Sequence, residues 1–476
     1  MGEARRRGSF NERSKSAIQR SKAKLISLMG QRDERDDSVL RAGIAPFIAR
    51  LSANEWSLRR AKILEALKSV DNGTELETAK PIRVQEDEII WYLFLCQQAL
   101  DDPLCMDVNQ VARAAPFFSG IGARWAYSCN VKGLEKKIDD VLYKYRKEPD
   151  GLIFEILVAL AYAEAGWMVE FLDEQRSAKS PDMRVFMNGI ELYIECKRLA
   201  RRTSYAEQER NEFLRLWDGA KHVLLQQNQC VWFKGNFHVE VTTLPKNFLA
   251  EIFAKALPIA AGEVLIYDGL EATIHARVID MKLVHLHLAR WRVKTNSPML
   301  NKLLGGDWAP LNSSTSIIKI ATVSQIVDCE VPVLGGYIDE INWACGFTRD
   351  FDSEISLSKK AKDVTKHLAD AVKQVPADKP SVIHIAAETL EGKHVERLRT
   401  RRVMESIPAF VSGKLVLGVR FHRFQANQTI DKLWEFDETV EQFQIEGPPL
   451  NDIIPLTVVV PKATLLRKGS HWNIYQ

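Results

Sequence analysis

The chain has 476 residues, which is too long for one ordinary hydrophobic core, so we expect two or three domains. Its hydrophobic fraction of 46% is typical of globular proteins, and no apolar run reaches the ~18 residues of a membrane span, which argues against a membrane protein. The net charge is only +3, so any surface that binds nucleic acid must be a local patch.

The number and spacing of the cysteines indicate the cellular compartment in which the protein folds. The sequence has seven of them, an odd number without a CxxC pair, which argues against a disulfide framework and against a structural zinc site. The N-terminus also lacks the apolar segment of a signal peptide. We therefore expect a protein of the reducing cytoplasm.

Residues 1–36 form a basic arm, at least partly disordered. The first 24 residues hold eight lysines and arginines, with serines between them. One interpretation is that this arm contacts phosphates. The alternative is a solvated tail or the exposed face of a first helix.

Residues 37–148 are expected to be a helical accessory region without recognisable chemistry. Three helices are expected: one capped by Ser52 or Asn54 and running through Leu67, one over residues 87–100, and one over residues 132–147. A loop between them is expected from the breakers Pro116, Gly120 and Gly122.

The next helix is unusual because it carries a carboxylate on an apolar stripe. Asp150 can cap it, and residues 152–165 are apolar nearly all round, as in a buried helix. Glu155 lies in this segment, where an ionised group is costly unless it is paired or bound to a metal. The alternative is that Glu155, near the helix start, meets water or an arginine.

A β-hairpin follows. Asn188-Gly189 stands between two β-rich runs, which is the strongest short-range hairpin signal because a type I′ turn needs positive φ at both central residues. A two-residue loop fixes the register, so that Met183 faces Ile194 and, one step further out, Asp182 falls opposite Glu195.

Alternation gives this hairpin an apolar face and a polar face. Asp182, Glu195 and Lys197 share the polar face. Two directly opposed carboxylates repel one another, and a hard divalent cation such as Mg²⁺ or Mn²⁺ would relieve that repulsion. A solvated polar face is the alternative, although it leaves the opposed carboxylates unexplained.

Pro181-Asp182, a spacer of twelve residues and Glu195-Cys196-Lys197 together resemble the motif of the PD-(D/E)XK nuclease superfamily, which has the restriction-endonuclease-like fold. The resemblance covers about residues 150–245 and implies a mixed α/β sheet flanked by helices, with Glu155 at the position of a further helix glutamate. It implies that Asp182, Glu195 and the carbonyl of Cys196 hold Mg²⁺, for which Mn²⁺ can substitute. Glu155 would bind the metal directly or through water, and Lys197 would orient the attacking water or hold a phosphate oxygen.

Three arginines follow the motif: Arg198, Arg201 and Arg202. A helix is expected from Ser204, in a capping box with Glu207, to Gln227. Its N-terminus beside these arginines predicts a site for nucleic-acid phosphates. The alternative is that the arginines pair with Glu207 and Glu209.

The remaining segments set the domain organisation. Strands over residues 230–233 and 237–243 are expected to complete a nuclease core of residues 149–245. Residues 246–350 are expected to be a β-rich insertion or domain, with strands over 264–267, 272–279 and 283–291; we interpret His285 and His287 in the last as structural or exposed. Residues 351–476 are an α/β region, with helices over 357–375 and 392–407 and strands over 381–386, 415–424 and 456–460. This region either extends the nuclease sheet or forms a domain of its own.

The sequence thus predicts a metal-dependent nuclease that hydrolyses phosphodiester bonds, with double-stranded DNA as the substrate by analogy with the superfamily. One alternative is a nucleic-acid-binding or assembly protein without activity on the same fold, although the intact Asp-Glu-Lys set argues against it. An RNA-processing nuclease is the other. A homodimer or partner subunits fit either reading, and a motor would be a separate subunit because no GxxxxGK[ST] motif is present.

Overall fold

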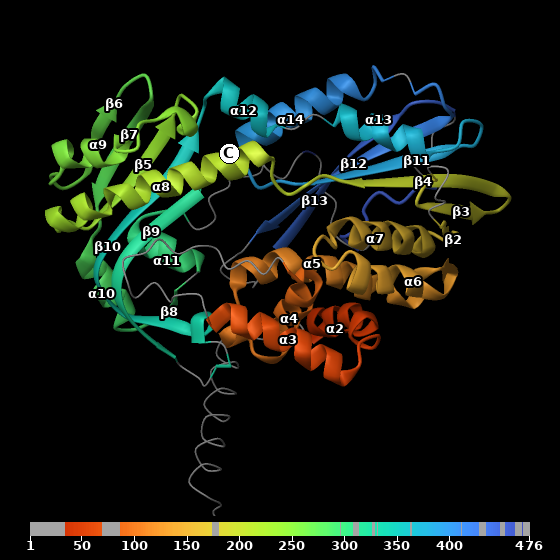
Figure 1. The fold of residues 1–476 in the computed structure, drawn as a ribbon, viewed down its shortest axis with the longest axis horizontal. Helices are drawn as coiled ribbons and strands as arrows, with labels where there is room; N and C mark the ends of the chain where they lie inside the picture. The colour runs from red at the N-terminus through yellow and green to blue at the C-terminus, as the bar shows by residue number, and fades with distance from the viewer. Residues whose placement is uncertain are drawn as a thin grey trace, which may run out of the picture.

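The computed structural model describes residues 34–68, 86–173, 180–295, 297–307, 314–325, 329–330, 332–361, 364–410, 412–427, 435–447, 453–461 and 469. These residues form a mixed α/β fold with two mixed sheets flanked by helices, as the sequence predicted for the fold class (Figure 1). The predicted basic arm lies outside the described residues up to position 33. No helix among the described residues is long and apolar enough to cross a membrane.

The first sheet has seven strands in the order β1-β2-β3-β4-β11-β12-β13 within the described ranges. Their bounds are β1 (Val131–Lys132), β2 (Met168–Phe171), β3 (Met183–Met187), β4 (Ile190–Arg198), β11 (Ser381–Glu388), β12 (Val416–Asn427) and β13 (Glu435–Gln444). β4, β11 and β12 run parallel, and the pairs β2–β3, β3–β4 and β12–β13 are antiparallel. The C-terminal region therefore extends the sheet of the hairpin, which confirms the first of the two expected arrangements.

The hairpin itself has the predicted register. Asn188 and Gly189 have φ of 49° and 81°, as a type I′ turn requires. Met183 pairs with Ile194 and Val185 with Leu192. Local turn chemistry was sufficient to predict this part of the fold.

One face of the first sheet is covered by the N-terminal helices, which lie below it in Figure 1. Phe94 and Phe118 from these helices share one hydrophobic core with Leu157 and with Ile194 of the sheet, so the region predicted as accessory is packed against the sheet rather than separate from it. The elements are α2 (Glu34–Ile48), α3 (Ala53–Lys68), α4 (Glu88–Asp101), η2 (Pro103–Cys105), α5 (Val108–Arg124), η3 (Trp125–Asn130), α6 (Leu134–Asp139), the π-helical η4 (Asp140–Lys144) and α7 (Asp150–Glu164).

The loop predicted from Pro116, Gly120 and Gly122 is wrong, because all three lie inside α5. Glycine serves here to let two helices touch. A Cβ on Gly122 would lie 1.9 Å from the carbonyl oxygen of Val39 in α2, and a Cβ on Gly43 would lie 1.8 Å from that of Phe118. Helix contact, rather than turn formation, explains these glycines.

The other face of the first sheet is covered by α13 (Thr365–Gln374) and α14 (Lys393–Ser406), which lie above it in Figure 1. The single helix predicted over residues 357–375 is two helices, α12 (Glu354–Lys360) and α13. α14 agrees with the predicted basic helix.

The strand predicted over residues 456–460 is absent from the described structure. The backbone there is bound by two fully buried side chains instead. Glu438 accepts hydrogen bonds from the N–H groups of Val458, Val459 and Val460, each at 2.9 Å. Arg124 donates to the carbonyl oxygens of the same three residues, at 2.9, 3.1 and 2.8 Å. The backbone is thus satisfied without a neighbouring strand.

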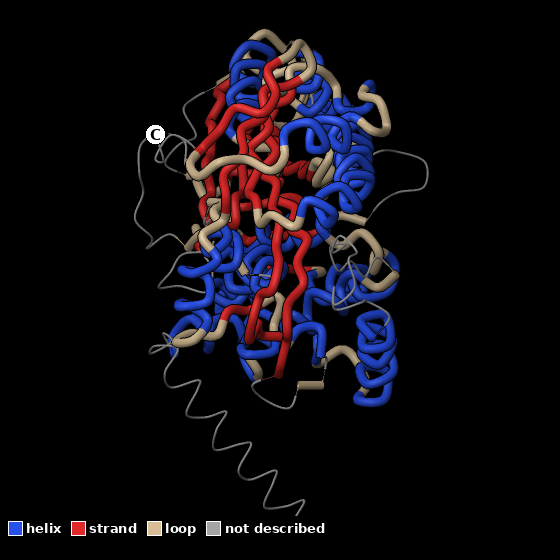
Figure 2. The backbone as a smooth tube through the Cα atoms, turned by 90° about the vertical axis from the view of Figure 1, so that its left-hand side faces the viewer, coloured by secondary structure: helices blue, strands red, loops and turns tan. Residues whose placement is uncertain are grey.

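The second sheet has the strand order β6-β7-β5-β10-β8, with β9 paired to β10. The strands are β5 (Val231–Phe237), β6 (Glu263–Asp268), β7 (Ala272–Val278), β8 (Val293–Lys294), β9 (Ser314–Gln325) and β10 (Gly336–Phe351). Its helices are α8 (Ser204–Gln227), α9 (Phe248–Ala256), α10 (Met281–Leu288) and α11 (Pro298–Leu304), with the short η5 (Val241–Thr243) and η6 (Pro332–Leu334). Figure 2 shows the strands of the molecule in its interior, with helices around them.

Two predictions about this region are wrong. β5 does not complete the nuclease core, because it pairs with β10 and β7 of the second sheet. The strand predicted over residues 283–291 is mostly the helix α10, whose first turn is capped by Asp280 through hydrogen bonds from the N–H groups of Lys282 and Leu283. The strands predicted over residues 264–267 and 272–279 are present as β6 and β7.

The close helix contact makes a prediction. Gly122→Ala should lower the free energy of unfolding by roughly 3 kcal/mol, because the added methyl would meet backbone atoms that cannot move aside. Gly151→Ala is the control, since its Cβ would meet nothing within 4 Å, and it should change stability by at most about 1 kcal/mol. Urea unfolding measures both, and equal effects would show that α2 and α5 do not pack in this way.

Candidate active site

The predicted site residues converge at the start of β3. Glu155 lies on α7, Asp182 directly precedes β3, and Glu195 and Lys197 lie on β4. The polar face of β4 is not open to solvent, because α13 covers it. Glu195 is 0% exposed, and Nζ of Lys197 donates a hydrogen bond to Oε1 of Gln374 in α13 at 2.7 Å. A solvated hairpin face therefore does not describe Glu195.

Asp182 is fixed beside Glu195 by the backbone. The regular ladder ends at the pair Met183–Ile194, and the carboxylate of Asp182 then accepts a hydrogen bond from the N–H of Cys196 at 2.7 Å. Its own carbonyl accepts one from the N–H of Leu172 at 3.0 Å. The aspartate thus lies next to the Glu195-Cys196 segment, as the register predicted.

One oxygen of Glu195 lacks a partner. Oε1 forms an ion pair with Nζ of Lys197, but Oε2 is buried and accepts no hydrogen bond from the residues that the structure describes. A buried carboxylate oxygen without a partner is costly, so its presence points to a group that binds there.

A second lysine belongs to the site, and sequence reasoning missed it. Lys137 of α6 donates to Oε2 of Glu155 at 2.6 Å, with side-chain exposures of 17% and 12%, and its Nζ lies 4.9 Å from the centre of the Phe171 ring. The sequence has only a weak signal that Lys137 lies in the interior, namely that it precedes an apolar residue, Ile138, which is buried. The adjacent lysine, Lys136, is largely exposed.

The three carboxyls hold their protons more tightly than usual. Burial raises the pKa of Asp182 to about 7, and the charge of Glu195 adds to this. Burial also raises the pKa of Glu155 to about 7, helped by the charge of Asp182 and opposed by Lys137. Burial raises the pKa of Glu195 to about 7 against the opposing effect of Lys197. Each charge disfavours the others, so the three groups titrate together.

The carboxylates of the site could hold a hard divalent ion only if water supplied most of its ligands. Among the described residues, no group of three or more His, Cys, Asp or Glu side chains could hold a metal ion. Magnesium, however, is usually held in proteins by one or two carboxylates and completes its shell with water. Asp182 and Glu195 with its unpartnered Oε2 provide such a pair.

Arg198 has a different place from the one predicted. It points away from Lys197, forms an ion pair with Glu388, and lies 5.8 and 5.1 Å from the ring centres of Phe117 and Phe424. Its side chain is only 5% exposed. Arg198 therefore belongs to the interior and not to a surface that phosphates can reach.

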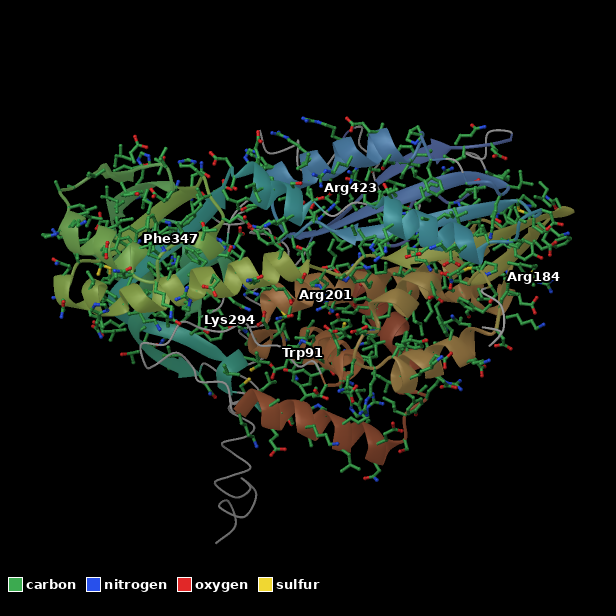
Figure 3. All side chains as sticks on the ribbon, turned by 45° about the horizontal axis from the view of Figure 1, so that its top comes forward. Trp91, Arg184, Arg201, Lys294, Phe347 and Arg423 are labelled. Carbon is green, nitrogen blue, oxygen red and sulfur yellow. The ribbon has the colours of Figure 1, made fainter. Side chains whose placement is uncertain are left out.

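Arg201 and Arg202 also bind carboxylates. Arg201 contacts Asp150 at 2.9 Å and Glu88, and Figure 3 places it in the middle of the molecule. Arg202 contacts Glu391 at 2.7 Å. These partners differ from Glu207 and Glu209, which the sequence suggested, and Thr203 rather than Ser204 caps α8. A role in phosphate binding stays a prediction for these two arginines.

A chain of buried polar groups lies on the face of the sheet that α7 covers, and sequence reasoning missed it too. Tyr162 contacts Nε2 of His384 at 3.1 Å, Nδ1 of His384 contacts Nε2 of His422 at 2.9 Å, and Nδ1 of His422 contacts Glu438 at 2.9 Å. His384 is the β11 neighbour of Cys196. Burial lowers the pKa of His384 well below its usual value, so this histidine is neutral.

Comparisons with known proteins found no match, so a functional argument has to start from the site itself. No family model, no curated protein and no solved structure matches the chain. The resemblance to the PD-(D/E)XK superfamily therefore rests on the motif residues alone.

The raised pKa values predict how stability depends on pH. Between about pH 5 and pH 7 the folded protein keeps protons that the unfolded chain has already released, since ordinary carboxyls titrate near pH ~4. The free energy of unfolding of the metal-free protein should therefore fall as the pH rises through this window and then level off. Asp182→Asn should flatten this dependence and raise the melting temperature at pH 8, in thermal melts with EDTA.

The control for this experiment is Asp378→Asn, which replaces an exposed aspartate outside the cluster. It should leave the pH profile as in the wild type. If Asp182→Asn melts below the wild type at pH 8, the carboxylates do not repel one another as described.

The place of Arg198 makes a separate prediction. Arg198→Met should lower the free energy of unfolding by roughly 2–3 kcal/mol, because it removes one of the two arginines that contact the buried Glu388. Arg215→Met, which breaks an exposed pair with Glu212 on α8, should cost at most about 0.5 kcal/mol. Denaturant unfolding compares them; a stable Arg198→Met variant that binds nucleic acid weakly would restore the surface role.

Proposed function

We propose that this protein is a metal-dependent nuclease that hydrolyses phosphodiester bonds, with double-stranded DNA as its substrate. The observation that carries the proposal is the pair of half-buried Asp182 and buried Glu195, joined to Lys197, in which Oε2 of Glu195 has no partner among the described residues. A structural ion pair would need only one of the two carboxylates.

The chain's own groups have separable tasks in this reaction. The N–H of Cys196 orients Asp182 through Oδ2, and Lys197 orients Glu195 through Oε1, which leaves Oε2 of Glu195 as the oxygen that would bind an ion. A bound Mg²⁺ or Mn²⁺ would lower the pKa of its water and stabilise charge on the attacked phosphate. Lys197 also donates to Gln374 and is 21% exposed, so its ammonium would be accessible to a phosphate oxygen of the substrate.

Contacts to the nucleic-acid backbone have to come from elsewhere than Arg198. α14 offers Arg397 and Arg401, both exposed and four residues apart, so that they lie on one helix face. α14 covers the same face of the first sheet as α13, which borders Lys197. The substrate class follows the superfamily that the motif resembles and is part of the proposal.

A reducing compartment, such as the cytoplasm, is also part of the proposal. None of the seven cysteines forms a disulfide. Reduced thiols are the rule in that compartment.

The proposal predicts the outcome of a cleavage assay. The purified full-length protein should cut supercoiled and linear DNA with Mg²⁺ or Mn²⁺ and not with EDTA. Glu195→Gln and Lys197→Met should each reduce the cleavage rate at least ~100-fold while DNA binding is kept, because they remove the ion's ligand and the phosphate contact. Lys373→Met, which removes an exposed lysine of α13, is the matched control and should cleave like the wild type.

Other outcomes would separate the alternatives. Cleavage of RNA but not DNA would favour an RNA-processing nuclease. Metal-independent binding without cleavage would favour a nucleic-acid-binding or assembly protein. Activity undiminished in EDTA or in Lys197→Met would exclude the mechanism.

A further inference from the structure

We propose that Lys137 is a built-in counter-ion that takes the place of a second divalent ion, so that the carboxylate cluster binds one metal ion and Glu155 is not a ligand of it. This inference rests on the proposed function, because it concerns the same cluster. It changes the role of Glu155 from a metal ligand to the partner of a lysine.

The contacts divide the three carboxylates into two sets. Glu155 is occupied by Lys137 at 2.6 Å, in a pair whose side chains are 12% and 17% exposed. Asp182 accepts a backbone hydrogen bond, and Glu195 keeps an oxygen without a partner. Among the described residues of the cluster, the fully buried oxygen without a partner belongs to the second set.

The charges agree with a single ion. When all three carboxylates are ionised, the cluster with its two lysines has a net charge of −1. One divalent ion would change this to +1, whereas two would give +3 in a largely buried site. A like charge a few ångströms away is strongly unfavourable at low effective dielectric, so the second ion is excluded while Lys137 is present.

Lys137 is held in place by its surroundings. Its Nζ lies over the Phe171 ring. The N-cap of α6 is Gly133, which has φ of 86° and lies so close to the same phenylalanine that an added Cβ would be 3.3 Å from the Cβ of Phe171. Arg50 binds Asp139 at the end of α6. Lys137 is therefore a positioning residue rather than one that touches the substrate.

The test counts Mn²⁺ ions by calorimetric titration and by electron paramagnetic resonance of the EDTA-stripped full-length protein, without substrate. The wild type should bind one Mn²⁺. Lys137→Met should bind two, with the first bound roughly tenfold tighter, because a repulsive charge is gone and Glu155 is released as a ligand. Lys137→Arg keeps the charge and should again bind one.

The controls identify the residue that matters. Lys136→Met removes a neighbouring exposed lysine and should bind one Mn²⁺ like the wild type. Glu155→Gln should also bind one, and the double variant Lys137→Met with Glu155→Gln should return from two ions to one. Thermal melts check folding, and Lys137→Gln replaces Lys137→Met if that variant does not fold.

The failures of the two proposals differ. One Mn²⁺ in both wild type and Lys137→Met, or two in the wild type, would overturn the counter-ion role and leave the nuclease proposal standing. No Mn²⁺ bound by the wild type at millimolar concentration would overturn the metal site, and the counter-ion role with it.

Discussion

The parallel pairing of β4 with β11 is the contact on which the candidate site depends. Parallel neighbours need a crossover connection, and here the crossover contains the whole second sheet. The pairing brings α13 onto the polar side of β4, where it buries Glu195 and places Gln374 against Lys197. All eight residues of β11 are buried, as expected for a strand with both faces covered. Without this pairing the Asp182–Glu195 pair would lie on an exposed hairpin, where water would screen its repulsion.

The sequence predicted those elements whose cause is local. The turn at Asn188-Gly189 fixed the hairpin register because two residues with positive φ allow little else. Prediction from the sequence failed where an element is determined by a partner that is distant in the chain. β5 has the composition of a strand, but nothing within it distinguishes the first sheet from the second. Gly122 is a helix breaker by composition, and only the approach of Val39 shows that it is a contact point.

The sequence predicted which carboxylates lie close together, but it did not predict which lysines pair with them. Asp182 and Glu195 followed from the register, whereas Lys137 comes from a helix with several lysines and is identified only by its contact with Glu155. For the arginines, the alternation of side chains along β4 was not followed past Lys197. Successive residues of a strand point to opposite faces, so Arg198 had to point away from Lys197, toward the apolar side where Glu388 lies. The same alternation that placed the carboxylates together argued against a cationic run on one surface.

Two buried polar networks beside β4 differ in how well they are satisfied, and this difference supports the proposed metal site. In the first network, beside Cys196, three contacts join Tyr162, His384, His422 and Glu438 into a continuous chain, and each contact pairs a donor with an acceptor. In the second network, around Glu195, three carboxylates share two lysines, and one buried oxygen of Glu195 has no partner among the described residues. The protein thus satisfies the first buried network but leaves the second short of positive charge. The second network lowers the stability of the fold, and packing alone does not explain why it is kept. Such a local shortfall is expected of a site that binds a cation from outside, because filling it within the protein would remove the reason for the cation to bind.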